Sequence, residues 1–214
     1  GIFYFFNFKK FKITSQIFNF FFLISISGVV IPGTLFYIAA SKVPAGILSL
    51  SVAFVPMLTY VSSLYLKIET FSLLRISGVF LGFIAIFLLI GPPDSFADRS
   101  MVPWVLLAMI CPICYTFENV FIDVKKPMEV NSITLALGSS AITILILLPI
   151  IFYFELFIDI KYPFQKIEFS IIALGFITAV AYTLFIYLIT NAGAVFASNV
   201  GYVVTISGVI WGIV

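Results

Sequence analysis

The sequence contains no histidine, and only 9% of its 214 residues are charged. Without histidine, the serine–histidine–aspartate triad, most zinc sites and haem ligation by histidine are excluded. The 11 basic residues are nearly matched by 9 acidic ones, which is too sparse and too balanced for a nucleic-acid partner. The composition therefore predicts no nucleic-acid partner and no cofactor.

Cysteine is almost absent as well. Cys111 and Cys114 have the C-x-x-C spacing of a redox or zinc pair, but they lie in an apolar stretch beside Pro112. No second pair of ligands exists to complete a tetrahedral zinc site. Two small residues packing inside a helix account for this spacing, so we predict no metal site.

Hydrophobic residues, in contrast, make up 63% of the chain, and the mean hydropathy is +1.24. Soluble proteins are about half apolar and about a quarter charged, because polar side chains must cover their surface. The surface of this protein must therefore face lipid. We predict a multi-pass integral membrane protein, residing in the cell (inner) membrane, whose direct surroundings are the lipid bilayer.

The apolar runs are too long and alternate too little for barrel strands, which predicts an all-α, polytopic bundle of transmembrane helices. A helix needs about 20 residues to cross a hydrocarbon core of about 30 Å. Seven spans are predicted: Ile17 to Ala40, Val43 to Leu66, Leu73 to Ile90, Val102 to Ile122, Ile133 to Phe154, Phe169 to Thr190, and Ala194 to Val214. The chain begins with Gly and ends in apolar sequence, so we expect a fragment in which residues 1–8 end a preceding span.

The basic residues indicate the orientation of the spans. One side of the membrane collects Lys9, Lys10, Lys12, Lys67, Arg75, Lys125 and Lys126, and the other collects Lys42, Arg99, Lys161 and Lys166. Positively charged loops are retained in the cytoplasm. The segment before the first predicted span should therefore be cytoplasmic.

Glu118 is the outlier within the predicted spans. A carboxylate deep in a bilayer costs about 3 kcal/mol and usually faces a partner or a water-filled cavity. One helical stripe contains Cys111, then Cys114 or Tyr115, and then Glu118. Two interpretations remain open: the stripe lines a cavity, or Glu118 reaches the headgroups or bonds a neighbouring helix.

Polar residues on the last span form the second candidate site. Asn199 and Tyr202 lie three positions apart among small residues, where an amide and a phenol could bind a polar solute or bond a neighbouring helix. Tyr37 and Tyr182 are further candidates, although tyrosine is also common at the bilayer interface. Ser49 belongs to the most polar span of the first half. The predicted substrate-binding residues are Tyr37, Ser49, Glu118, Tyr182, Asn199 and Tyr202.

Small residues also indicate where helices pack. Gly78 to Gly82 and Gly208 to Gly212 are both G-x-x-x-G motifs, which allow two helices to approach closely. We expect them to serve structure.

A weak internal repeat accompanies these motifs. A shift of 149 residues aligns Leu35 and Phe36 with Leu184 and Phe185, Ala45 with Ala194, Ser49 with Ser198, and Val55 with Val204. The first span then matches the sixth, five helices later. Because five is odd, the two copies would have opposite orientations in the membrane.

The sequence resembles the EamA-like members of the drug/metabolite transporter superfamily. The resemblance rests on the small-residue turn and helix that run from residue 36 to 49, on Pro56, and on the segments 66–70 and 75–79. A degenerate second copy covers residues 192–199. Ile68 and Thr205 depart from the family pattern, which commonly has glycine and proline there.

This resemblance implies a fold of ten helices in two inverted five-helix repeats. The chain would hold the third to ninth helices, with residues 1–95 ending the first repeat and residues 96–214 forming a truncated second one. A central cavity would be lined mainly by the first, second, sixth and seventh spans. Glu69, in the loop, would be structural, capping a helix or pairing with Lys67 or Arg75, and would not contact the solute.

The predicted function is a secondary transporter that exports a small metabolite, amino acid or drug-like solute by alternating access, with Glu118 as a candidate carrier of a coupling proton. A candidate partner is a second copy of the chain, with which it would form a homodimer. The alternatives are a non-transporting membrane scaffold and a membrane-embedded enzyme. The sequence offers no polar catalytic cluster for a membrane-embedded enzyme, since no G-x-S-x-G motif occurs and no Asp lies within a predicted span. We therefore expect no enzymatic activity.

Overall fold

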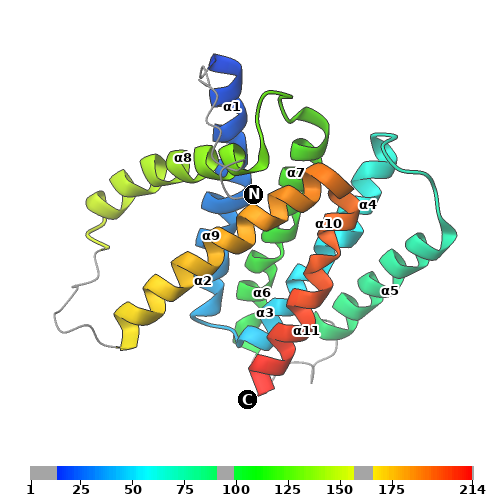
Figure 1. Cartoon of the computed structure of the whole chain (residues 1–214). Helices are drawn as coiled ribbons and strands as arrows, with labels where there is room; N and C mark the ends of the chain where they lie inside the picture. Colours follow the sequence, from blue (N-terminus) through cyan, green and yellow to red (C-terminus); the bar gives the residue numbers. More distant parts are fainter. Residues whose placement is uncertain (1–13, 91–98, 157–165, 214) are drawn as a thin grey trace.

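The computed structural model describes residues 14–90, 99–156 and 166–213, and these ranges contain helices and no strand (Figure 1). The prediction of an all-helical fold is therefore confirmed. The elements are α1 (Ser15–Ile24), a π-helical turn η2 (Ser25–Val30), α2 (Ile31–Ala40), α3 (Ala45–Val52), α4 (Phe54–Tyr65), α5 (Leu73–Ile90), the short 3₁₀ turn η3 (Arg99–Met101), α6 (Val102–Ala108), α7 (Ile110–Lys125), α8 (Ser132–Tyr153), α9 (Lys166–Ala192), α10 (Ala194–Ser198) and α11 (Val200–Ile213). The expectation for residues 1–8 lies outside the described residues.

Within the described residues, six helical segments are long and apolar enough to cross a membrane, as a multi-pass integral membrane protein requires. They are Ser15–Ala40, Ala45–Tyr65, Arg99–Lys125, Ser132–Tyr153, Lys166–Ala192 and Ala194–Trp211. Their ends lie within three residues of the predicted ones. The remaining predicted span is α5, a helix of 18 residues, and its crossing of the membrane stays a prediction.

Several of these segments consist of two shorter helices that follow each other directly. The first is interrupted by η2, where the Ile31 N–H bonds the Ile26 carbonyl five residues back. Pro32 follows directly and has no N–H for the Gly28 carbonyl, which accounts for the widened turn. Short breaks at Ala53, Met109 and Asn199 likewise divide three of the other spans, whereas α8 and α9 are continuous.

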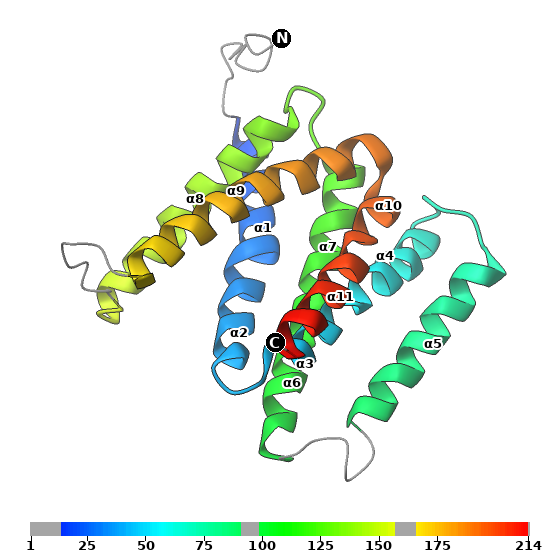
Figure 2. The ribbon, with the colours of Figure 1, turned by 60° about the horizontal axis from the view of Figure 1, so that its bottom comes forward.

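The helices alternate in direction. The ends of α4, α7 and α9 lie at one end of the molecule, and the α2–α3 turn and the start of α6 lie at the other (Figures 1 and 2). Because α3 packs along α11 and α4 packs along α7, the second span lies inside the bundle.

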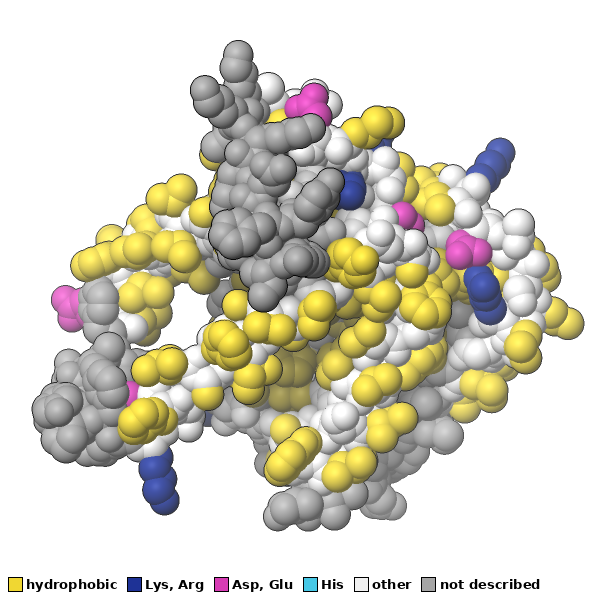
Figure 3. Space-filling model, viewed as in Figure 1, with side chains coloured by type: hydrophobic (Ala, Val, Ile, Leu, Met, Phe, Trp, Pro, Cys, Tyr) yellow, Lys and Arg dark blue, Asp and Glu magenta, His cyan; other side chains and the backbone are white. Residues whose placement is uncertain are grey.

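The most exposed part of the described chain is the α8–α9 pair. These helices pack on each other and extend away from α4, α5 and α11 (Figure 2). Only 6% of the most apolar window of α9 is buried. The face of the molecule drawn in Figure 3 is largely hydrophobic and carries few charged side chains.

Candidate functional site

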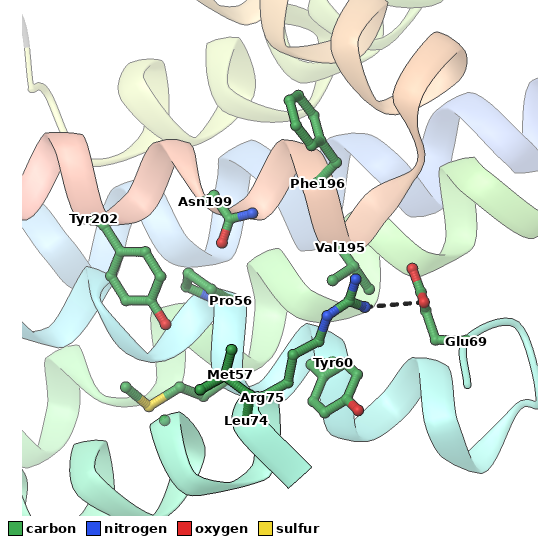
Figure 4. Close-up of a pocket in the computed structure, with 11 residues that line it drawn as sticks. Pro56, Met57, Tyr60, Glu69, Leu74, Arg75, Val195, Phe196, Asn199 and Tyr202 are labelled. Atoms are coloured by element: carbon green, nitrogen blue, oxygen red, sulfur yellow. Dashed lines mark hydrogen bonds and ion pairs between the residues drawn. The ribbon is translucent and has the colours of Figure 1, made fainter. Parts of the chain in front are cut away.

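A pocket of about 330 Å³ lies between α4, the start of α5, and the α10–α11 pair (Figure 4). Its lining is mostly apolar but includes charged and hydrogen-bonding side chains, and we call it the polar pocket after these. Its lining residues are Pro56, Met57, Tyr60, Glu69, Leu74, Arg75, Gly78, Val195, Phe196, Asn199 and Tyr202. All of these come from two stretches, residues 56–78 and residues 195–202. The pocket therefore lies between the two halves of the chain.

One wall of the pocket is an ion pair held against an aromatic ring. Arg75 Nη1 lies 3.0 Å from Glu69 Oε2, and the guanidinium lies 5.4 Å from the centroid of the Tyr60 ring. The Tyr60 hydroxyl accepts the Ser72 N–H at 2.7 Å and donates to the Thr70 carbonyl at 3.2 Å. Of the alternatives predicted for Glu69, the structure shows the ion pair with Arg75, but Glu69 also lines the pocket, which corrects the expectation that it lies away from a solute. Tyr60 fixes the turn that carries both residues to α4.

The opposite wall carries Asn199 and Tyr202. Asn199 lies at the break between α10 and α11, and Tyr202 follows three residues later on the same face. Both side chains project toward Pro56 and Met57 of α4 (Figure 4). The pocket thus offers an amide, a phenol and an ion pair beside apolar side chains, a combination that suits a small amphipathic solute.

The predicted candidate Ser49 lies elsewhere, at the crossing of α3 and α11. The Thr205 hydroxyl donates to the Ser49 carbonyl at 2.9 Å, and the Ser49 hydroxyl lies 3.4 Å from the Thr205 carbonyl. A Cβ atom at Gly208 would overlap the Ser49 side chain. Ser49 therefore holds two helices together and does not line the polar pocket.

Glu118 and Tyr182 form a separate pair. Glu118 is only 2% exposed, and the Tyr182 hydroxyl donates to its Oε1 at 2.6 Å. The carboxylate also lies against Gly28, at the π-helical turn, where no side chain could be accommodated. Of the two interpretations of Glu118, its contacts match the second, because the carboxylate is hydrogen-bonded to a neighbouring helix.

Tyr37, the sixth candidate, is 67% exposed on α2 and belongs to neither group. The six predicted residues thus divide into a pocket pair, a buried acid–phenol pair, one residue at a helix crossing and one exposed tyrosine. No site contains more than two of them among the described residues.

A buried polar strip lies where α4 packs on α7, a pairing of helices that the sequence did not identify. The Thr59 and Thr116 hydroxyls lie 3.5 Å apart, and Ser63 and Asn119 follow about one turn further along the same two helices. Within the described part of the chain, neither the Ser63 hydroxyl nor the Asn119 amide has a hydrogen-bond partner. Asn119 could have indicated this strip from the sequence, since a buried amide between apolar residues needs hydrogen-bond partners.

No family model, no curated protein and no solved structure matches this chain. The candidate functional features of the molecule are the pocket between the halves and the Glu118–Tyr182 pair. Among the described residues, no group of three or more Cys, Asp or Glu side chains is placed to hold a metal ion.

Proposed function

We propose that the protein is a secondary transporter that binds a small amphipathic solute between its two halves and moves it by alternating access. The observation that carries this proposal is the position of the polar pocket, whose walls come from residues 56–78 on one side and 195–202 on the other. A site shared by two halves opens to either side of the membrane when the halves rock against each other. A rigid scaffold has no need for such a site.

The crossing of two interrupted spans supports an inverted repeat of the EamA-like kind. Under the shift of 149 residues, Val52 is equivalent to Gly201, and these two residues meet where the spans cross. A Cβ atom at Gly201 would lie 3.0 Å from the Val52 carbonyl oxygen and 3.3 Å from Pro56 Cδ. Contact between equivalent residues of two helices is expected at a two-fold axis that relates two repeats.

The chemistry of the pocket limits the solute. A volume of about 330 Å³ is at the lower end for small-molecule sites. Asn199 and Tyr202 supply hydrogen bonds, and Met57 and Phe196 supply apolar contact. A metabolite or drug-like solute with one polar end and one apolar end meets both requirements.

Glu118 is our proposed site for a coupling proton. The carboxyl is buried, and Tyr182 is its hydrogen-bond partner on another span. A buried carboxyl that gains or loses a proton changes its bond to the phenol, and this change can bias the packing of α7 against α9.

Ligand-dependent stability tests the proposal. The purified protein in detergent is heated with a panel of small metabolites and drug-like solutes, and a ligand of the folded state raises the melting temperature. We expect Asn199→Ala and Tyr202→Phe to reduce that increase, and uptake or export in membrane vesicles to fall with it.

Asn191→Ala is the matched control for Asn199→Ala. Asn191 is exposed at the end of α9, where its amide bonds the Tyr187 carbonyl at 2.7 Å, outside the pocket. If Asn199→Ala kept the full response while Asn191→Ala lost it, or if no solute stabilised the protein, the pocket would not be a transport site.

A further inference from the structure

A second cavity lies along α4 and α7, and the proposed transport site does not use it. Its volume is about 630 Å³, and its lining is mostly apolar. The residues are Val61, Ser62, Tyr65, Leu66, Ile113, Thr116, Phe117, Val120, Phe121, Val124 and Lys125. We call this cavity the α4–α7 groove.

The groove has the length of one bilayer leaflet. From Ile113 to Lys125 the rise along α7 is about 18 Å, and half of a hydrocarbon core is about 15 Å. The rings of Phe117 and Phe121 stack at 5.4 Å on one side. Ile113 and Phe117 are 60% and 48% exposed, so the groove opens outward to lipid.

Positive charge gathers at one end of the groove. Lys125 lines it, Lys126 follows, and Lys67 comes directly after Leu66 on the other wall. Of the carboxylates at this end, Glu69 pairs with Arg75, Asp123 Oδ2 accepts the Ala194 N–H at 2.9 Å, and Glu129 lies in the exposed connection after α7. The three lysines outnumber Asp123 and Glu129, so this end of the groove keeps an excess of positive charge that attracts an anion at the membrane surface.

We propose that the α4–α7 groove binds one anionic phospholipid, with an acyl chain along Phe117 and Phe121 and the phosphate at Lys125. An acyl chain suits an apolar channel that runs along two helices in contact at Thr59 and Thr116 and opens to lipid. Lysines near an anionic leaflet are worth about 1 kcal/mol each, which is about fivefold in affinity.

The test compares lipids with the same acyl chains and different headgroups. The purified protein is titrated with phosphatidylglycerol or phosphatidylcholine, and the melting temperature and the lipid retained in native mass spectra are measured. We expect phosphatidylglycerol to bind more tightly, and Lys125→Gln to weaken its binding about fivefold. Binding of phosphatidylcholine should weaken less, because its choline ammonium already offsets the phosphate charge. Inorganic phosphate, which has the charge without the chain, should not raise the melting temperature.

Two variants complete the design. Lys42→Gln removes an exposed lysine in the turn between α2 and α3 and should leave the preference for phosphatidylglycerol intact. This turn lies at the end of the molecule opposite to the end of α7 (Figure 1). Ser62→Phe fills the groove without changing charge and should reduce retention of the lipid. The proposal is overturned if both lipids bind equally, if Lys42→Gln acts like Lys125→Gln, if Ser62→Phe changes nothing, or if inorganic phosphate alone stabilises the protein as phosphatidylglycerol does.

Discussion

At the scale of single residues, Gly28 and Glu118 depend on each other. A Cβ atom at position 28 would overlap the Glu118 carboxylate, which is buried and has little room to move. We expect Gly28→Ala to displace the carboxylate from Tyr182 and to lower the free energy of unfolding by about 1 to 3 kcal/mol. Gly33→Ala is the control, since a Cβ atom there has no neighbour within 4 Å. Thermal unfolding in detergent should separate the two variants, and equal melting temperatures would contradict this packing.

The bond between Glu118 and Tyr182 can be measured by a double-mutant cycle. Tyr182→Phe removes the donor of the 2.6 Å bond and should destabilise the protein by about 1 to 3 kcal/mol. In a Glu118→Gln background the loss should be smaller, because the hydrogen bond to a charged partner is already gone. Tyr187→Phe, on an exposed side chain of the same helix, is the control. Additive effects of the two substitutions would show that the residues do not interact.

The same carboxyl gives a functional prediction. If it carries the coupling proton, Glu118→Gln should make transport independent of the pH gradient, because glutamine cannot gain or lose a proton. Uptake into vesicles is measured with and without a gradient, and Tyr187→Phe again serves as the control. Transport by Glu118→Gln that still follows the gradient would exclude proton coupling through this residue.

Sequence alone identified Glu118 because a carboxylate in an apolar helix is costly. It could not identify Tyr182 as the partner, since the two residues are 64 positions apart and many tyrosines lie at membrane interfaces. Asn199 and Tyr202 were predicted together because their separation along the chain is short. Arg75 and Tyr60 were not assigned to the site, because nothing local shows that the turn after α4 folds back over the pocket.

At the scale of elements, the crossing of α3 and α11 depends on Gly208. A Cβ atom there would overlap Ser49, so Gly208→Ala should force the helices apart and lower the melting temperature. Gly175→Ala in α9 is the control, because that position is open and alanine is the better helix former by about 1 kcal/mol. The first variant should be destabilised and the second unchanged or stabilised. A stabilised Gly208→Ala would mean that α3 and α11 are not in close contact.

The lengths of the apolar runs predicted the helical spans well, because a span must cross a hydrocarbon core of fixed thickness. The breaks within the spans were harder to foresee. Pro32 lies inside the first span, where proline bends a helix, but whether it produces a kink or a π-helical turn depends on neighbours such as Glu118 and Ser139, which pack on η2. The G-x-x-x-G pattern had the same limit: Gly208 lies at a close helix contact, whereas Gly78 has no neighbour within 4 Å.

At the scale of the whole molecule, the orientation and the number of crossings can be tested together. Lys42 lies in the exposed turn before α3, and Met128 lies in the exposed connection after α7. The α3–α4, α5 and α6–α7 segments separate these two positions. Three crossings would place them on opposite sides of the membrane, and two crossings, with α5 lying outside the bilayer core, would place them on the same side.

We expect three crossings, with Met128 in the cytoplasm. Lys67, Arg75, Lys125 and Lys126 belong to the Met128 side, and basic loops are retained there. With Cys111 and Cys114 replaced by alanine, Lys42→Cys should react with an impermeant maleimide on intact cells, and Met128→Cys should react only after permeabilisation. Reaction of both cysteines from outside, or of neither, would mean that α5 does not cross. In that case the polar pocket, which α5 helps to enclose, would open at the membrane surface and could not alternate between the two sides.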